Sequence, residues 1–222
     1  DGRAGRIDPP REPRGRARRE PGSRVRPAGC DGGATRGRGR GAAEAGTQQK
    51  RTRRADLHDR LWAEQKRAVL VVVQGIDAAG KDGTIMKVAR AFNPQGCPVT
   101  AFKIPSAEEL AHDFLWRVHL HVPKHGEIGF FNRSHYEAVL VERVHAIVTK
   151  RVWSARYNQI NEFEHMLSEN GTTVVKVFLQ IDRDVQRERL QARYDDPSKR
   201  WKFSMGDLAE RLLWDVYHLA SQ

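Results

Sequence analysis

The sequence has few cysteines, no long apolar run and, over its first 50 residues, almost no large apolar side chains. Its two cysteines, Cys30 and Cys97, form no spaced pair, which excludes a disulfide framework and a cysteine metal motif. No apolar run approaches the length of a membrane span, and the N-terminus lacks the apolar core of a signal peptide. These absences predict a cytoplasmic protein with no membrane partner.

Residues 1–50 contain no Leu, Met, Phe, Tyr or Trp and hold 13 Lys and Arg against 6 Asp and Glu. Such a segment buries too little surface to offset its ordering entropy, so we expect a disordered basic tail before a domain over 55–222. The tail carries most of the net charge of +11, so the charge is weak evidence for nucleic acid. The Arg-Gly run 36–41 could bind RNA, but a solvated tail or a misplaced start codon is favoured.

The alternation of strand and helix signals sets the expected fold class. Apolar, β-branched runs predict strands over 68–73, 99–104, 127–131 and 172–181. Helical spacing predicts helices over 56–66, 81–92, 107–122, 134–150, 157–169, 183–194 and 207–219. This order is typical of an α/β fold with a mostly parallel sheet and helices on both faces. In such sheets ligands bind at the carboxyl ends of the strands.

The stretch 69–84, VLVVVQGIDAAGKDGT, has the layout of a phosphate-binding loop. A buried strand runs into a glycine turn and then into a helix N-terminus, where backbone N–H groups can point at phosphate oxygens. The spacing of Gly75, Gly80 and Lys81 matches the start of G-x-x-x-x-G-K-[ST]. Lys81 would supply an ammonium for the phosphates.

This motif is incomplete, because Asp82 follows the lysine and the nearest hydroxyl, Thr84, comes two residues late. Asp77 inside the loop would repel phosphate unless a metal ion lay between them, which favours a site where Mg²⁺ bridges Asp77 and a polyanion. The alternative is a simple turn before a core helix. The predicted phosphate-contacting positions of the loop and helix start are Gly75, Ala78, Ala79, Gly80, Asp82, Gly83 and Thr84.

A second group of polar residues follows the third predicted strand. Asn132 takes the place where an acid often holds Mg²⁺ in phosphate-loop proteins, and Arg133 comes directly after it. An arginine there can bridge phosphates and offset charge in a phosphoryl-transfer transition state, although an ion pair with Glu137 is the alternative. Asn132 and Glu137 are predicted to belong to the phosphate- or nucleotide-binding site. We interpret His135 as a structural histidine rather than a catalytic one.

A third group is the basic segment 183–206, which is interpreted as a lid that closes over phosphates. Its cations are Arg187, Arg189, Arg193, Lys199, Arg200 and Lys202. Trp201 and Phe203 give the segment apolar anchors, whereas interleaved acids favour the alternative, a solvated charged helix. Arg117 is a further candidate phosphate contact, though lone arginines usually form salt bridges.

Taken together, these motifs resemble the second family of polyphosphate kinases from about residue 55 onward. The motifs that carry the resemblance are IDAAGKDGT (76–84), NPQG (93–96), PSAEEL (105–110), GEIGFFNRSHYE (126–137) and WKFS (201–204). The form NRSHYE is similar to the subgroup that phosphorylates AMP as well as ADP.

The resemblance implies a P-loop kinase-like three-layer sandwich with a helical lid. It also implies reversible, Mg²⁺-dependent phosphoryl transfer between inorganic polyphosphate and the nucleotides AMP, ADP and ATP. Asp77, Lys81 and Arg133 would be catalytic, Asp77 would also bind the metal, and Arg200 and Lys202 would follow the polyphosphate chain. Family members are often dimers or tetramers, so a homo-oligomer is implied.

The sequence departs from the family at Ala138, where an acid is usual. Family members also continue past this C-terminus, so we expect the sheet to lack an edge strand and to expose apolar surface on its neighbour. Two alternatives to the family activity stay open at this point. One is an ATP-dependent nucleoside monophosphate kinase, and the other is a non-catalytic polyanion or RNA binder acting through the Arg-Gly tail.

Overall fold

The computed structural model describes residues 40–221, and it confirms the predicted α/β fold class. The strands are β1 (Ala68–Gln74), β2 (Val99–Ala101), β3 (Ile128–Asn132) and β4 (Thr172–Phe178). They form one parallel sheet in the order β2-β3-β1-β4. This order places the two strands that precede the predicted site loops, β1 and β3, side by side at the centre of the sheet.

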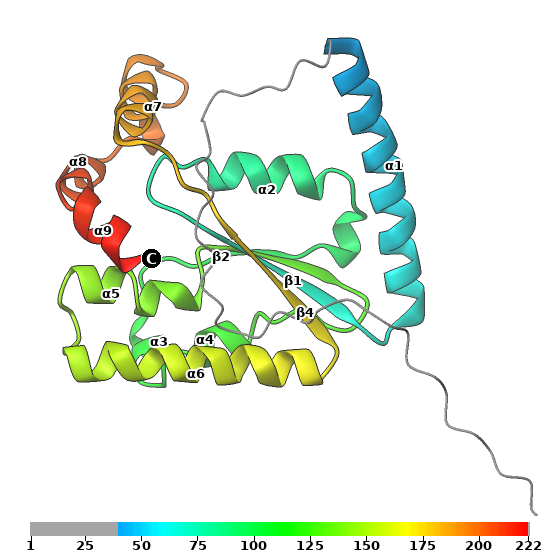
Figure 1. Cartoon of the computed structure of the whole chain (residues 1–222), viewed down its shortest axis with the longest axis horizontal. Coiled ribbons are helices and arrows are strands. Elements are labelled where there is room, and N and C mark those ends of the chain that lie inside the picture. Colours follow the sequence, from blue (N-terminus) through cyan, green and yellow to red (C-terminus); the bar gives the residue numbers. More distant parts are fainter. Residues whose placement is uncertain (1–39, 222) are drawn as a thin grey trace, which may run out of the picture.

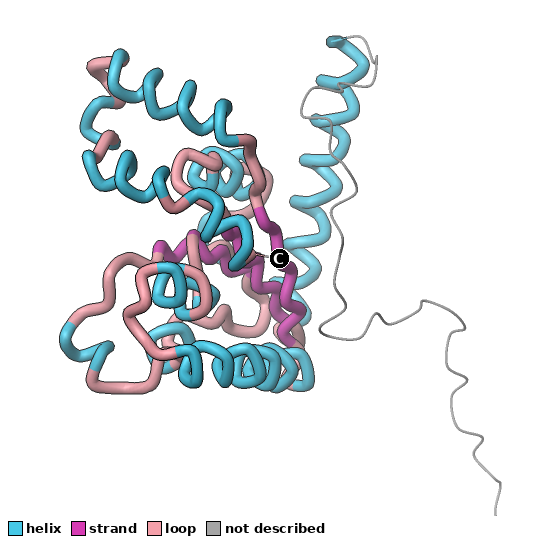
Figure 2. The backbone as a smooth tube through the Cα atoms, turned by 60° about the vertical axis from the view of Figure 1, so that its left-hand side comes forward, coloured by secondary structure: helices cyan, strands magenta, loops and turns pink. Residues whose placement is uncertain are grey.

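Helices cover both faces of the sheet, with α2 on one face and α6 on the other, and further helices lie beyond its two ends (Figure 1). The α-helices are α1 (Arg40–Glu64), α2 (Lys81–Ala89), α3 (Ala107–Leu110), α4 (Trp116–His119), α5 (Val141–Val144), α6 (Lys150–Glu169), α7 (Arg183–Asp195), α8 (Met205–Leu212) and α9 (Trp214–Ala220). Short 3-10 helices are η1 (Pro94–Gly96), η2 (His135–Ala138) and η3 (Arg200–Lys202). The helices after β4 lie together on one side, opposite α1 (Figure 2). Over residues 40–221, no helix is long and apolar enough to cross a bilayer.

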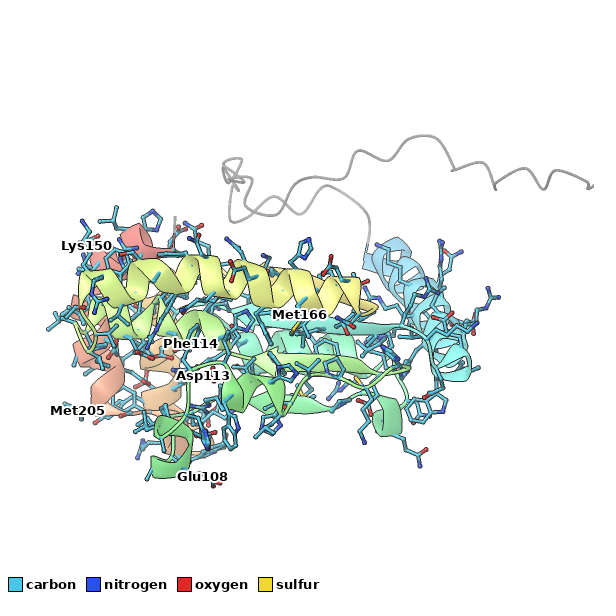
Figure 3. All side chains as sticks on the ribbon, turned by 90° about the horizontal axis from the view of Figure 1, so that it is seen from below. Glu108, Asp113, Phe114, Lys150, Met166 and Met205 are labelled. Atoms are coloured by element: carbon cyan, nitrogen blue, oxygen red, sulfur yellow. The ribbon has the colours of Figure 1, made fainter. Side chains whose placement is uncertain are left out.

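The alternation of β1 side chains builds the three layers. Leu70 and Val72 face α6, where they join a buried cluster with Phe163 and Leu167. Val73 faces the opposite way and packs in a second cluster that includes Ile85 of α2. Figure 3 shows α6 crossing the sheet with Lys150 and Met166 toward opposite ends of the helix. Burial of both strand faces explains why β1 reads as a continuous apolar run.

The predicted tail boundary is wrong, because α1 already begins at Arg40. Residues 42–49 contain three Ala, two Gln and one Glu, which favour helix, and they extend a helix whose other end is anchored in the core. The anchor is His58, whose Nδ1 accepts a hydrogen bond from the main-chain N–H of Asn93 and whose Nε2 donates to the carbonyl of Gly96. The rest of the predicted tail, with Cys30 and most of the Arg-Gly run, lies outside the described residues.

Two helices that were predicted to be continuous are each divided in the structure. The helix expected over 107–122 becomes α3 and α4, because the Asp113 carboxylate accepts hydrogen bonds from the N–H groups of Leu115 and Trp116 and starts a new turn. The capping box of Ser106 and Glu109 is confirmed. The helix expected over 134–150 becomes η2 and α5, and Ala146 takes a left-handed conformation before α6 starts.

Other differences concern boundaries. The second predicted strand ends at Ala101 and the fourth at Phe178, while the helix expected over 207–219 divides at Leu213 into α8 and α9. In the described sheet β4 is an edge strand, and Val175 and Phe178 are 41% and 43% exposed.

Candidate active site

The loop after β1 has the conformation of a phosphate cradle. Ala78 and Gly80 take positive φ values of 62° and 98°, and α2 begins directly at Lys81. The carbonyl of Ile76 accepts a hydrogen bond from the N–H of Ala79 at 3.1 Å, which closes the turn. At Gly75 a Cβ would lie 2.7 Å from the carbonyl oxygen of Leu179, so only glycine fits beside the end of β4. Gly83 and Thr84 lie on the first turn of α2.

Lys81 lies over the loop that precedes it. Its Nζ donates to the carbonyls of Gly75 and Ile76 at 2.6 Å and 3.0 Å. The residue is buried, and burial lowers the pKa of its ammonium while the nearby Asp77 carboxylate opposes that shift. The ammonium is therefore held inside the turn by main-chain oxygens, at the place where the motif predicts contact with phosphate.

Arg133, the first residue after β3, reaches across to the loop after β1. Its guanidinium lies 2.8 Å from Oδ1 of Asp77 and 3.5 Å from Oε2 of Glu137. Burial opposes the charge of Arg133, but Glu137 and Asp77 outweigh it and raise the pKa of the guanidinium. The ion pair with Glu137 that was weighed as an alternative is therefore present, beside a shorter contact with Asp77.

Asn132, at the end of β3, and Asp82, at the start of α2, form a second link beside the one between Arg133 and Asp77. The side-chain amide of Asn132 donates to Oδ1 of Asp82 at 2.6 Å. Lys202, in the predicted lid, lies 3.7 Å from Oδ2 of Asp82. One residue of the predicted lid thus already contacts the start of α2.

Helix α7 holds the outer side of the phosphate loop, which the sequence analysis did not anticipate. Gln186 donates to the carbonyl of Asp77, and NH1 of Arg189 donates to the carbonyls of Ala78 and Ala79, each at 3.0 Å. Arg189, one of the predicted lid cations, contacts the main chain of the loop instead. No sequence signal distinguished it from its neighbours Arg187 and Arg193.

Two predicted phosphate contacts lie apart from the loop. Arg117 pairs with Glu109 at 3.2 Å and stacks over Phe102, with 5.2 Å between its guanidinium carbon and the ring centroid. Arg200 donates from Nε to the carbonyl of Tyr194 at 2.9 Å. Within the described residues neither touches the Gly75–Lys81 turn, so their assignment to phosphate stays a prediction.

A cavity opens beside Asp77 and Arg133, and the helices after the lid form one wall of it. Its polar side holds Gln74 and Glu137, and its apolar side is lined by Leu140, Phe178, Trp214 and Tyr217. Burial raises the pKa of the Tyr217 hydroxyl, and Glu210 raises it further. The hydroxyl also lies 3.3 Å from Nε2 of His145, which pairs with Glu210 at 2.8 Å. The contribution of α8 and α9 was not foreseen.

The donor set around Asp77 fits a hard divalent cation shared with phosphate. Among the described residues no group of three or more His, Cys, Asp or Glu side chains could hold a metal ion. Mg²⁺, however, is commonly held by one or two carboxylates together with substrate phosphates and water. In the described contacts only Oδ1 of Asp77 accepts a hydrogen bond, from Arg133, so Oδ2 would be available to a cation.

A parallel α/β sandwich with a lysine-tipped phosphate loop defines the P-loop kinase-like class, and solved structures agree. The structure titled "Crystal structure of Polyphosphate Kinase 2 from Arthrobacter aurescens TC1" aligns with a TM-score of 0.84 at 45% identity, over 90% of this chain and 73% of that one. Residues 39–222 match the family described as Polyphosphate kinase 2 (PPK2). The chain belongs to the polyphosphate kinase 2 family. The match begins at residue 39, ahead of residue 55, where the motifs that carry the resemblance were expected to begin.

Two curated relatives align over 74% of this chain. An "AMP/ADP-polyphosphate phosphotransferase" of Meiothermus ruber is 56% identical. An "ADP-polyphosphate phosphotransferase" of Rhodopseudomonas palustris is 49% identical. The chain spans 61% of the length of each relative.

Proposed function

We propose that this chain transfers phosphoryl groups reversibly between inorganic polyphosphate and the nucleotides AMP and ADP, with Mg²⁺ as cofactor. The observation that carries the proposal is the convergence of Lys81, Asp77 and Arg133 on one phosphate loop. The names of the two relatives support the substrates, and the higher identity to the AMP/ADP enzyme supports AMP as an acceptor. The cytoplasm, where these nucleotides are plentiful, is the proposed location.

The residues supply charge neutralisation and positioning rather than a strong base. A nucleotide phosphate is already an anion, so no proton has to be removed before it attacks. Lys81 and Arg133 place two positive charges beside the loop, where they offset the charge that develops on the transferred group. Asp77 would hold Mg²⁺, which when bound neutralises phosphate oxygens. Lys202 and the rest of the 183–206 segment would then exclude water.

A direct assay tests the proposal. The purified chain is incubated with Mg²⁺, polyphosphate of several defined lengths, and either AMP or ADP. Formation of ADP and ATP above the blank is expected, and it should disappear when polyphosphate or Mg²⁺ is omitted. No product at any chain length would contradict the proposal. Transfer from ATP to AMP without polyphosphate would instead favour a nucleoside monophosphate kinase.

A further inference from the structure

The turn after β3 holds Arg133 in a conformation that its surroundings must maintain. Arg133 has a positive φ of 63°, in the left-handed region. Non-glycine residues adopt such conformations at a cost in free energy and keep them only where the surrounding structure fixes them. The main-chain N–H of Arg133 donates to the carbonyl of Val73 at 3.1 Å, which holds the turn to the end of β1. The side chains that follow Arg133 must supply the remaining constraints.

On the side of β1, Gln74 contacts the turn at two points. The side-chain nitrogen of Gln74 donates to Oε1 of Glu137, and its side-chain oxygen, Oε1, accepts from the hydroxyl of Ser134 at 3.3 Å. The Ser134 hydroxyl in turn accepts from the N–H of Tyr136 at 3.2 Å. These contacts fix the edge of the turn that faces the phosphate loop.

On the opposite side a single carboxylate, Glu164 of α6, accepts hydrogen bonds from three side chains. Oε1 accepts from Nε2 of His135 at 3.2 Å and from the hydroxyl of Tyr136 at 2.7 Å. Oε2 accepts from Nζ of Lys176, on β4, at 2.6 Å. We call His135, Tyr136, Glu164 and Lys176 the Glu164 network. It joins His135 and Tyr136, the second and third residues after Arg133, to helix α6 and strand β4.

Glu164 and His135 form the buried part of the network, whereas the Lys176 side chain is 47% exposed. Glu164 is 8% exposed and the His135 side chain is fully buried. Burial alone would raise the pKa of Glu164, but hydrogen bonds from His135, Lys176 and Tyr136 hold it at about 2. A carboxylate only accepts hydrogen bonds, so Nε2 of His135 carries the proton. His135 is therefore a structural residue here, in line with its interpretation from sequence.

We infer that Glu164 is a positioning residue for Arg133, acting through His135 and Tyr136 to hold the guanidinium against Asp77. Attachment of α6 to the sheet does not require this carboxylate. Phe163 and Leu167 of the same helix are already buried in the core at 6% and 5% exposure. The kcat measurement described next rests on the proposed function, whereas the measurement of phosphate binding does not.

A double-mutant cycle separates positioning from general stability. Glu164→Gln and Arg133→Lys are made singly and together, and the affinity for tripolyphosphate is measured by titration calorimetry, alongside kcat. Glu164→Gln keeps the size of the side chain but turns one acceptor into a donor that faces Lys176. We expect Glu164→Gln to weaken binding about tenfold in the Arg133 protein but less than about twofold in the Arg133→Lys protein, because residues linked by one hydrogen-bond network are energetically coupled.

Glu162→Gln is the matched control, because Glu162 is exposed on the same helix, and it should leave affinity and kcat unchanged. Equal losses in both Arg133 backgrounds, or no loss in either, would overturn the inference. If Glu164→Gln does not fold, Tyr136→Phe removes one hydrogen bond from the network and enters the same cycle. Binding without turnover would defeat the proposed function while the binding cycle still decides the role of Glu164. Absence of tripolyphosphate binding in the unaltered chain would overturn both.

Discussion

The guanidinium of Arg133 lies 2.8 Å from the carboxylate of Asp77, although 56 positions separate the two residues in the sequence. The sheet explains this contact. β1 and β3 pair in parallel with Val73 opposite Asn132, so the residues just beyond each strand emerge at the same edge. Register therefore determines which residues of the two loops meet.

Asp77→Asn should lower kcat by about 100-fold or more, the loss that follows removal of one preorganised electrostatic group. The amide cannot pair with Arg133 as an anion and is a poor ligand for Mg²⁺. The rate is measured with polyphosphate and ADP over a range of Mg²⁺ concentrations, and the half-saturating concentration should rise. Asp184→Asn, at an exposed position on α7, is the control. A variant with the Mg²⁺ dependence of the unaltered chain would refute a metal-binding role for Asp77.

The sequence predicted this much of the site because strands, glycines and a lysine carry local signals. An apolar β-branched run gave β1, and the spacing of Gly75, Gly80 and Lys81 gave the loop. The main-chain contacts of Gln186 and Arg189 depend on how α7 packs against the loop, which is a tertiary relationship without local periodicity. Exposed arginines on a charged helix look alike in sequence, so the one that faces inward could not be identified.

Arg189→Met should raise the KM for polyphosphate about tenfold with a smaller effect on kcat. It removes two hydrogen bonds to the carbonyls of Ala78 and Ala79, and hydrogen bonds from charged groups contribute about 1.5–3 kcal/mol. The left-handed Ala78 would then be less well held. Steady-state kinetics tests this, with Arg187→Met as the control, since the Arg187 side chain is 68% exposed. Equal effects of the two substitutions would contradict a specific role for Arg189.

Gly75→Ala and Gly83→Ala should change stability in opposite directions. At Gly75 the new methyl group would lie 2.7 Å from the Leu179 carbonyl oxygen and 3.2 Å from Ala79 Cβ, so a loss of about 1–3 kcal/mol is expected. At Gly83, on the first turn of α2, nothing outside the nearby helix backbone would lie within 4 Å of an added Cβ. Alanine there should therefore raise the free energy of unfolding by about 0.4–1 kcal/mol. Denaturant unfolding measures both. The reverse order would show that the loop does not lie against the end of β4.

The limits of sequence patterns are clearest where helices were predicted too long. Apolar residues recur at helical spacing on both sides of Asp113, so periodicity alone gave one helix. The Asp113 carboxylate competes for main-chain N–H groups and divides it. Likewise, the composition of residues 1–50 indicated disorder, yet α1 extends back to Arg40 because its far end is anchored by His58 in the core.

Lys202→Met should raise the KM for polyphosphate several-fold at low ionic strength, with a smaller difference at high salt. Lys202 is partly exposed and 3.7 Å from Asp82, so its attraction to a polyanion is screened over a Debye length of about 10 Å at 0.1 M salt. KM is measured from about 20 mM to 500 mM salt, so that the Debye length is longer than about 10 Å at the low end and shorter at the high end. Lys87→Met, at an exposed position near the end of α2, should have no effect. A salt-independent difference would argue against a polyanion contact.

The Glu164 network should stabilise the fold above about pH 4.5 and lose that contribution in acid. The pKa of Glu164 is lowered to about 2 from an ordinary value of 4.5. The folded chain therefore binds fewer protons than the unfolded chain between those values, and stability falls as the pH drops through that window. The difference in unfolding free energy between the unaltered chain and Glu164→Gln should be full at pH 7 and shrink steadily toward pH 2. Denaturant unfolding at several pH values measures it, with Glu162→Gln expected to show a flat, small difference. A Glu164→Gln difference that did not change between pH 5 and pH 2.5 would mean that the carboxylate is not held as a buried anion by His135, Tyr136 and Lys176.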